Sequence, residues 1–271
     1  GHLGLHKEKD CPQMAEVMLG MVSPSYRRSH CLMRIGQSLA EYAMTSDLIC
    51  GFSGLVTKHT YSQKSAAMFA MKPAALRLSL HPRAEYRAIG AAANERETLL
   101  DSFVFVKPIA ELAVAAPEAH RDIIGRILGG LNVAWHPMAA DANAVEGEET
   151  RLNVHAQPDI GLGTIRVERY GKDFVHEVTR VRRQLCRERL DTLYLFLDLA
   201  NPFVAAVFPE LEAAGFFFSG VRPKTLDRWE ALCTYLNNQE LDYGTIQVFD
   251  PFGVELLEYV KACEKRAQEL L

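Results

Sequence analysis

The residues best suited to do chemistry lie between positions 15 and 39. An apolar strand is expected over residues 15–22, and the segment 23–28, which contains Tyr26 and two arginines, leads from it directly into a helical pattern. A strand that ends at a helix N-terminus creates an anion site, because unpaired N–H groups and the positive end of the helix dipole converge there. The sequence therefore predicts an anion-binding turn between this strand and this helix.

Groups that can transfer protons lie close to this turn or follow it in sequence. Glu16 lies on the expected strand, His6 on an expected strand over residues 2–6, and Tyr61 at the start of a later helix. Each could accept or donate a proton if the fold brings it to the anion site. For Glu16, the alternative is an exposed strand carboxylate with no catalytic role.

The composition indicates a globular protein and excludes several classes of partner. The chain has 271 residues, of which 48% are hydrophobic and 24% are charged, so its length suits one large or two ordinary domains, and we expect two. Its formal net charge of -4 gives no basic surface for nucleic acid, and no apolar run is long enough to cross a membrane. The six cysteines show no Cys-x-x-Cys pair, which predicts free thiols in a cytoplasmic protein. His2 and His6 have no accompanying carboxylate motif, so we expect no metal site.

Hydrophobic periodicity predicts alternating strands and helices along the first half of the chain. The helix after Arg27 has Leu32, Ile35, Leu39 and Ala43 on one face, at the spacing of a buried stripe. Proline and glycine mark the ends of several further elements. We expect strands over residues 48–56, 74–80 and 99–106, and helices over residues 62–69 and 117–130.

The second half of the chain repeats this order of elements. Residues 136–150 contain almost no large apolar residue, which predicts a linker there. Both halves then show helix, aspartate, strand, helix, strand and a closing proline in turn, which indicates a structural duplication. Chance recurrence of a common α/β order is the alternative. The expected strands are residues 151–156, 164–170, 192–199 and 216–221, and the expected helices are residues 173–189 and 202–214.

Several segments together resemble the GNAT acyltransferase superfamily. The order strand, Pro-x-Tyr-Arg, helix is one of them, and residues 57–64, 215–223 and 236–238 are the others. The Phe-Phe-Phe-Ser-Gly run within residues 215–223 is the most specific match. The similarity is to a bacterial subgroup in which the acyltransferase-like region often follows an ATPase domain of the anti-sigma-factor kind.

The resemblance implies an α/β protein made of two tandem GNAT-like lobes, with mixed sheets flanked by helices. The first lobe is then residues 1–135, including a short helical extension, and the second is residues 151–271, with the linker 136–150 between them. The first lobe is expected to be incomplete, because the strands that precede the central strand in the family would lie ahead of Gly1.

In this family a turn between a strand and the helix that follows it grips the pyrophosphate of an acyl-coenzyme A. The resemblance implies that residues 22–39 form this segment, with acetyl-CoA or another acyl-CoA as donor. It implies Glu16 as the base for the attacking amine and Tyr61 as a substitute for the tyrosine that protonates the departing thiolate, whose own positions hold Ala66 and Leu211. The implied donor-binding residues are Val22, Arg27, Arg28, Ser29, His30 and Cys31.

Two functions remain open at this point. The first is an acyl-CoA-binding, acyltransferase-like protein that transfers an acetyl group to an amine. The alternative is a catalytically inactive sensory or regulatory module of a bacterial signalling protein, which binds a small molecule or a protein partner such as an upstream ATPase domain. Arg28 and His30 stand where the family has glycine, and they either add charge to a phosphate site or lie on a helix that has lost its ligand.

Overall fold

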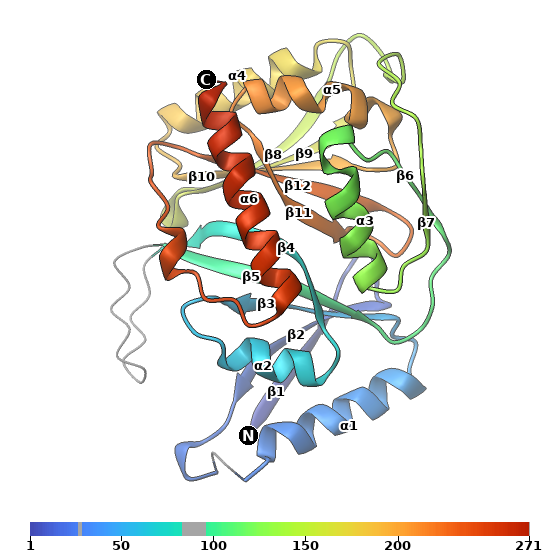
Figure 1. Cartoon of the computed structure of the whole chain (residues 1–271), viewed down its shortest axis with the longest axis vertical. Coiled ribbons are helices and arrows are strands. Elements are labelled where there is room, and N and C mark those ends of the chain that lie inside the picture. Colours follow the sequence, from blue (N-terminus) through green and yellow to red (C-terminus); the bar gives the residue numbers. More distant parts are fainter. Residues whose placement is uncertain (27–28, 83–95, 271) are drawn as a thin grey trace.

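One continuous mixed sheet forms the centre of the protein (Figure 1). The computed structural model describes residues 1–26, 29–82 and 96–270. The ten strands of the sheet follow the order β1-β2-β3-β5-β4-β11-β12-β10-β9-β8, and β6 and β7 pair separately. Six α-helices lie within these described ranges, so the α/β class expected from the sequence is confirmed.

The elements alternate along the chain as the hydrophobic patterns predict. The strands are β1 (His2–Lys7), β2 (Met14–Met21), β3 (Cys50–Val56), β4 (Lys72–His81), β5 (Glu97–Phe105), β6 (Leu112–Val114), β7 (Trp135–Pro137), β8 (Arg151–Gln157), β9 (Leu162–Arg169), β10 (Thr192–Asp198), β11 (Phe217–Pro223) and β12 (Trp229–Leu236). The helices are α1 (Cys31–Thr45), α2 (Tyr61–Met68), α3 (Arg121–Gly130), α4 (Phe174–Arg187), α5 (Pro202–Ala213) and α6 (Pro251–Glu269).

The sheet consists of two halves with the same topology. Strands β1–β5 with α1 and α2 are called the first half here, and strands β8–β12 with α4 and α5 the second half. In the first half β1 and β2 are antiparallel, β2 and β3 are parallel, and β5 lies antiparallel between β3 and β4. The second half repeats each of these pairings with β8, β9, β10, β12 and β11. The repeated order of elements in the sequence therefore corresponds to a repeated arrangement in space.

The two halves meet where β4 pairs antiparallel with β11. Gly220 is the register partner of Ala75 at this junction. The backbone of Gly220 has a φ of 132°, and a Cβ on this residue would overlap the Cα of Ala75. Only glycine allows this close approach of two backbones. Both halves consequently share one sheet, where the sequence predicts a mixed sheet in each lobe.

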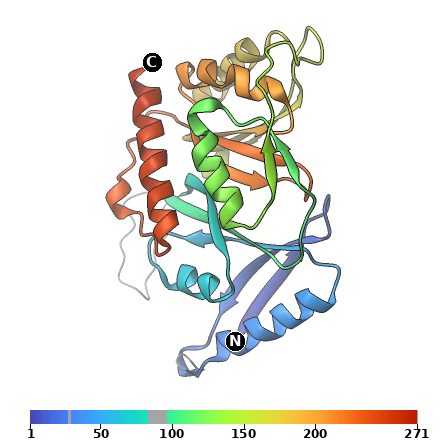
Figure 2. The same ribbon diagram turned by 45° about the vertical axis from the view of Figure 1, so that its right-hand side comes forward.

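A large hydrophobic core fills the face of the sheet that carries the helices. Along β10, Leu193, Leu195 and Leu197 belong to this core, whereas Tyr194 and Phe196 point to the opposite face, because successive side chains of a strand alternate. Helices α3 and α6 each pack on both β4 and β11 (Figure 2). The helix layer therefore bridges the junction between the halves.

A second, smaller core lies on the opposite face, where the end of the β4–β5 hairpin reaches the second half. Leu80 and Leu99 from this hairpin pack in one cluster with Tyr194 and Leu232. The hydroxyl of Tyr194 donates a hydrogen bond to the carbonyl of Leu78 at 2.7 Å. The hairpin thus covers part of the second half in addition to pairing at the junction.

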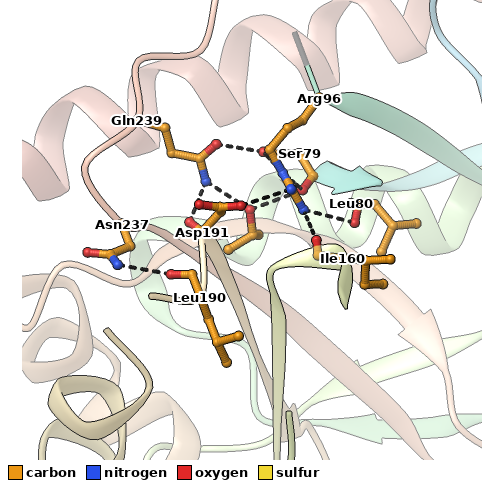
Figure 3. Close-up of polar contacts among 9 residues, drawn as sticks. Ser79, Leu80, Arg96, Ile160, Leu190, Asp191, Asn237 and Gln239 are labelled. Atoms are coloured by element: carbon orange, nitrogen blue, oxygen red, sulfur yellow. Dashed lines mark hydrogen bonds and ion pairs between the residues drawn. The ribbon is translucent and has the colours of Figure 1, made fainter. Parts of the chain in front are cut away.

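Polar contacts hold the end of this hairpin in place (Figure 3). The guanidinium of Arg96 forms an ion pair with Asp191 at 2.9 Å and donates to the carbonyl of Ile160 at 2.6 Å. Gln239 accepts a hydrogen bond from the hydroxyl of Ser79 at 2.8 Å. These residues come from both halves, so they fix the two halves relative to each other.

Two further observations bear on the class of protein. Within residues 1–26, 29–82 and 96–270, no helix has the length and apolar character that a membrane span requires. All six cysteines carry free thiols.

Candidate functional site

The parallel strands β2 and β3 separate soon after they begin. Among the described residues they pair from Met14 to Glu16, and the last pair joins Glu16 to Phe52, although β2 continues to Met21 and β3 to Val56. Beyond this pair, β2 and β3 form no ladder with each other, and we call this separation of the two strands the opening. Backbone groups at such a separation can donate to a ligand, and in α/β sheets ligands bind beyond the carboxyl ends of the strands.

Helix α1 begins at Cys31, after the turn that follows β2, so the expected order of strand, turn and helix is present. His30 precedes the helix in the left-handed conformation, with φ 57° and ψ 18°, and its side chain makes no capping hydrogen bond. The hydroxyl of Ser29 donates to the carbonyl of Tyr26 at 2.6 Å, which closes the turn. The first turn of α1 therefore has no capping side chain within the part of the chain that the structure describes.

Four of the predicted donor-binding residues lie in the described part of this turn: Val22, Ser29, His30 and Cys31. Val22 follows β2 directly, and Cys31 is the first residue of α1. The thiol of Cys31 lies against Gly1. Arg27 and Arg28 lie outside the described residues.

Glu16 lies on the face of the sheet opposite the helices. Its strand partners are His6 on β1 and Phe52 on β3, so the two candidate bases share one face. Phe52 and Gly54 point to the same side of β3, and a Cβ on Gly54 would overlap Nη2 of Arg77. The guanidinium of Arg77 therefore lies over β3 at the place where β2 and β3 separate.

Arg77 belongs to a charged cluster that the sequence analysis did not identify. Its Nε and Nη2 contact one oxygen of Asp101 at 2.8 and 2.6 Å, and Arg222 contacts the other oxygen at 3.2 Å. The side chain of Asp101 is only 3% exposed. Burial acts to lower the pKa of Arg77, but the charges of Asp101 and Glu16 contribute to raising it above its ordinary value. The signal in the sequence is a charge flanked by apolar residues within a strand, as at Arg77 between Leu76 and Leu78 in β4.

Tyr61 is not brought together with Glu16. It is the first residue of α2, its side chain is 65% exposed, and its ring lies 5.3 Å from that of His59. Helix α2 ends beside α1 on the helix face, whereas Glu16 points to the opposite face. Ala66 and Leu211, the two positions at which the sequence resemblance implies a missing acid, are both buried aliphatic residues.

The second half has an equivalent opening, which side chains close. Strands β9 and β10 pair as far as Arg166 and Phe196 and continue beyond this pair to Arg169 and Asp198. The buried Tyr170 follows β9, and its hydroxyl accepts a hydrogen bond from the backbone N–H of Asp198 at 2.9 Å. The phenol thus bridges the gap between the two strands.

Residues 146–150 occupy the turn between β9 and α4. The backbone N–H of Lys172 donates to the carbonyl of Gly147 at 3.1 Å, and that of Gly171 donates to the hydroxyl of Thr150 at 3.0 Å. A Cβ on Gly171 would overlap the backbone of Thr150. Two N–H donors of this turn are therefore taken up by residues 147 and 150, whereas no side chain among the described residues caps the first turn of α1.

A polar cavity of about 570 Å³ lies beside the closed opening, at the carboxyl ends of β9 and β10. Arg166 and Glu230 form an ion pair within it, with Nη1 2.7 and 2.6 Å from the two carboxylate oxygens. Asp198 and Arg228 form a second pair at 2.8 Å.

Among the described residues, no cluster of His, Cys, Asp and Glu side chains could hold a metal ion.

Comparison with known proteins identifies no relative of this chain. A scan of protein-family models, a search of curated proteins and a search of solved structures each find no match.

Proposed function

We propose that this chain is an acyl-CoA-binding, acyltransferase-like protein that takes its acyl donor in the first half and transfers the acyl group to an amine. The separation of β2 from β3 after Glu16, next to the uncapped N-terminus of α1, is the observation that carries this proposal. An acyl-CoA presents the two chemical features that such a site accepts, a pyrophosphate and a narrow polar chain with a thioester at its end.

The phosphates would bind at the first turn of α1, where unpaired N–H groups and the helix dipole favour negative charge. The chain of the donor would then lie in the opening between β2 and β3 and use the unpaired backbone groups there. Tyr170 and residues 146–150 fill the equivalent space in the second half. We therefore propose one donor site in each chain.

Transfer requires a base for the amine and donors for the thioester oxygen. Glu16, or its strand partner His6, would take the proton as the amine nitrogen attacks the carbonyl carbon, and N–H groups of β2 would stabilise the oxyanion. The new C–N bond forms first and gives a tetrahedral oxyanion, whose collapse restores the carbonyl and breaks the C–S bond. The departing thiolate then takes a proton from water. Turnover is expected to be slow, because neither Ala66 nor Leu211 can act as an acid.

The absence of an acid at these two positions favours a second candidate function. Ala66 and Leu211 are both buried, at 8% and 0% exposure, so neither position offers a site for proton transfer to the thiolate. A protein that binds the donor without turning it over would serve as a sensory or regulatory module, with an upstream ATPase domain or another signalling protein as its partner.

Thermal unfolding with acetyl-CoA tests the proposal. Donor at about 100 times its dissociation constant should stabilise the folded state by about 2.7 kcal/mol, which shifts the melting temperature by at least a few degrees. Replacing Arg27 and Arg28 by Glu should abolish this shift, because the new carboxylates repel the phosphates. Arg180→Glu, an exposed change on α4, is the matched control and should leave the shift intact.

The outcomes separate the candidates. A shift that survives the double Glu substitution would move the donor elsewhere in the molecule. A shift without turnover would favour the regulatory module, and no shift with any acyl-CoA tested would contradict donor binding altogether.

A further inference from the structure

We propose that the cavity at the carboxyl ends of β9 and β10 binds a small zwitterion, either a free amino acid or a dipeptide, through its amine and its carboxylate. This site lies in the second half and is separate from the donor site proposed above. It uses residues that have no part in donor binding.

Charges of opposite sign line opposite sides of this cavity. Lys224 and Arg228 lie on the turn between β11 and β12, where the N–H of Lys224 donates to the carbonyl of Arg228 at 2.9 Å. Glu168 lies on β9, and the N–H of Glu146 donates to the carbonyl of Tyr170 just after β9 at 2.7 Å. Because β10 lies between β9 and β12 in the sheet, these two groups face each other across it.

The floor of the cavity is fixed and already neutral. The guanidinium of Arg166 lies 4.1 Å from the ring centroid of Phe196 and is held by both carboxylate oxygens of Glu230. The side chain of Glu230 is 6% exposed, so its charge is satisfied within the protein. Arg228 is likewise paired with Asp198, so the charges left to meet a ligand are those of Lys224 on one wall and of Glu146 and Glu168 on the other.

The arrangement of the walls selects the class of ligand. A purely anionic ligand would be repelled by Glu146 and Glu168, and a purely cationic one by Lys224. A molecule with an ammonium at one end and a carboxylate at the other pairs with both walls. A volume of about 570 Å³ lies within the range of small-molecule sites and accepts an amino acid or a dipeptide.

The side chains of the walls are free to make such contacts. Lys224 is exposed, and Arg228 keeps 59% of its side chain exposed while one nitrogen contacts Asp198. Glu168 accepts one hydrogen bond, from the amide of Asn153 at 3.2 Å, and is otherwise exposed. Both walls can therefore bind a ligand without breaking a buried interaction.

Isothermal titration of the whole chain with the standard amino acids and with L-alanyl-L-alanine tests this proposal. At least one of these probes should bind with a dissociation constant of about 1 mM or lower, and its N-acetylated and C-amidated forms should bind about tenfold more weakly or worse. Lys224→Glu and Glu168→Gln should each weaken binding about tenfold, because each removes the partner of one end of the ligand. Lys265→Glu on α6, away from the cavity, is the matched control and should bind as the parent does.

The melting temperature of each variant without ligand checks that it is folded, and the acetyl-CoA shift measured on the same samples checks the donor site independently. Binding that is unaffected by both wall substitutions, or by blocking both ends of the probe, would overturn the proposal. So would the absence of binding by every probe to a folded protein, whether or not acetyl-CoA binds.

Discussion

Replacing Asp101 by Asn should remove about 3–5 kcal/mol from the free energy of unfolding. The change keeps the shape of the side chain but deletes the carboxylate that contacts both Arg77 and Arg222, at 2.6 and 3.2 Å. At such distances an ion pair in a protein is worth about 4 kcal/mol at an effective dielectric constant near 20. The guanidinium side chains are 21% and 18% exposed, so water compensates only part of the loss. The free energy of unfolding of a typical domain is about 5–15 kcal/mol, so a loss of this size is large.

Urea unfolding, followed by tryptophan fluorescence, to which the buried Trp229 contributes, measures this loss. With a slope of about 2 kcal/mol/M, the midpoint should fall by about 1.5–2.5 M. Glu255→Gln, which breaks the exposed pair between Arg126 and Glu255, is the control and should leave the midpoint nearly unchanged. Adding Arg222→Met to the Asp101 variant should restore part of the stability, because it removes one uncompensated cation. Equal midpoints for the Asp101 and Glu255 variants would refute the argument that the shared carboxylate neutralises a buried cluster.

Three further predictions follow from single residues. Burial lowers the pKa of His120 below its ordinary value of 6.5, so the unfolded chain binds more protons than the folded one as the pH falls. The free energy of unfolding should therefore be at its full value above about pH 6.5 and decrease below it. Urea midpoints across this range should show a slope that His120→Gln removes, and an unchanged slope would assign it to other groups. Gly220→Ala should cost about 2 kcal/mol or more, because it places a Cβ on the backbone of Ala75 at a positive φ, and a neutral result in urea unfolding would contradict the close approach. Tyr170→Phe should cost about 1–3 kcal/mol by leaving the N–H of Asp198 unpaired, and unchanged hydrogen exchange at that amide would show that the phenol does not bridge the strands.

Local patterns in the sequence are sufficient to predict most elements of the fold. The expected helix over residues 173–189 corresponds to α4 (Phe174–Arg187), and the expected strand over residues 192–199 corresponds to β10 (Thr192–Asp198). These elements follow the spacing of apolar residues, which reports burial along a single segment. The repeated order of elements in the two halves is visible in the same way.

The sequence does not reveal the contacts between distant segments. Strand β12 and helix α6 are not among the predicted elements, and the junction at Gly220 depends on two backbones that meet only in the folded sheet. The cluster of Arg77, Asp101 and Arg222 likewise joins three strands, and each residue taken alone gives a weak signal. The sequence places a linker at residues 136–150 because large apolar side chains are scarce there, but residues 146–150 contact the turn after β9 mainly through backbone atoms, which leave no hydrophobic pattern.

The position of α6 across the junction affects the order in which the chain can fold. As the polypeptide leaves the ribosome, β4 emerges long before α6, which packs on both β4 and β11 (Figure 1). The first half therefore carries an uncovered apolar surface throughout the synthesis of the second, a state that favours aggregation or chaperone binding. Contacts of such long sequence separation also slow folding. We expect that neither half, expressed alone, reaches the stability it has in the intact chain.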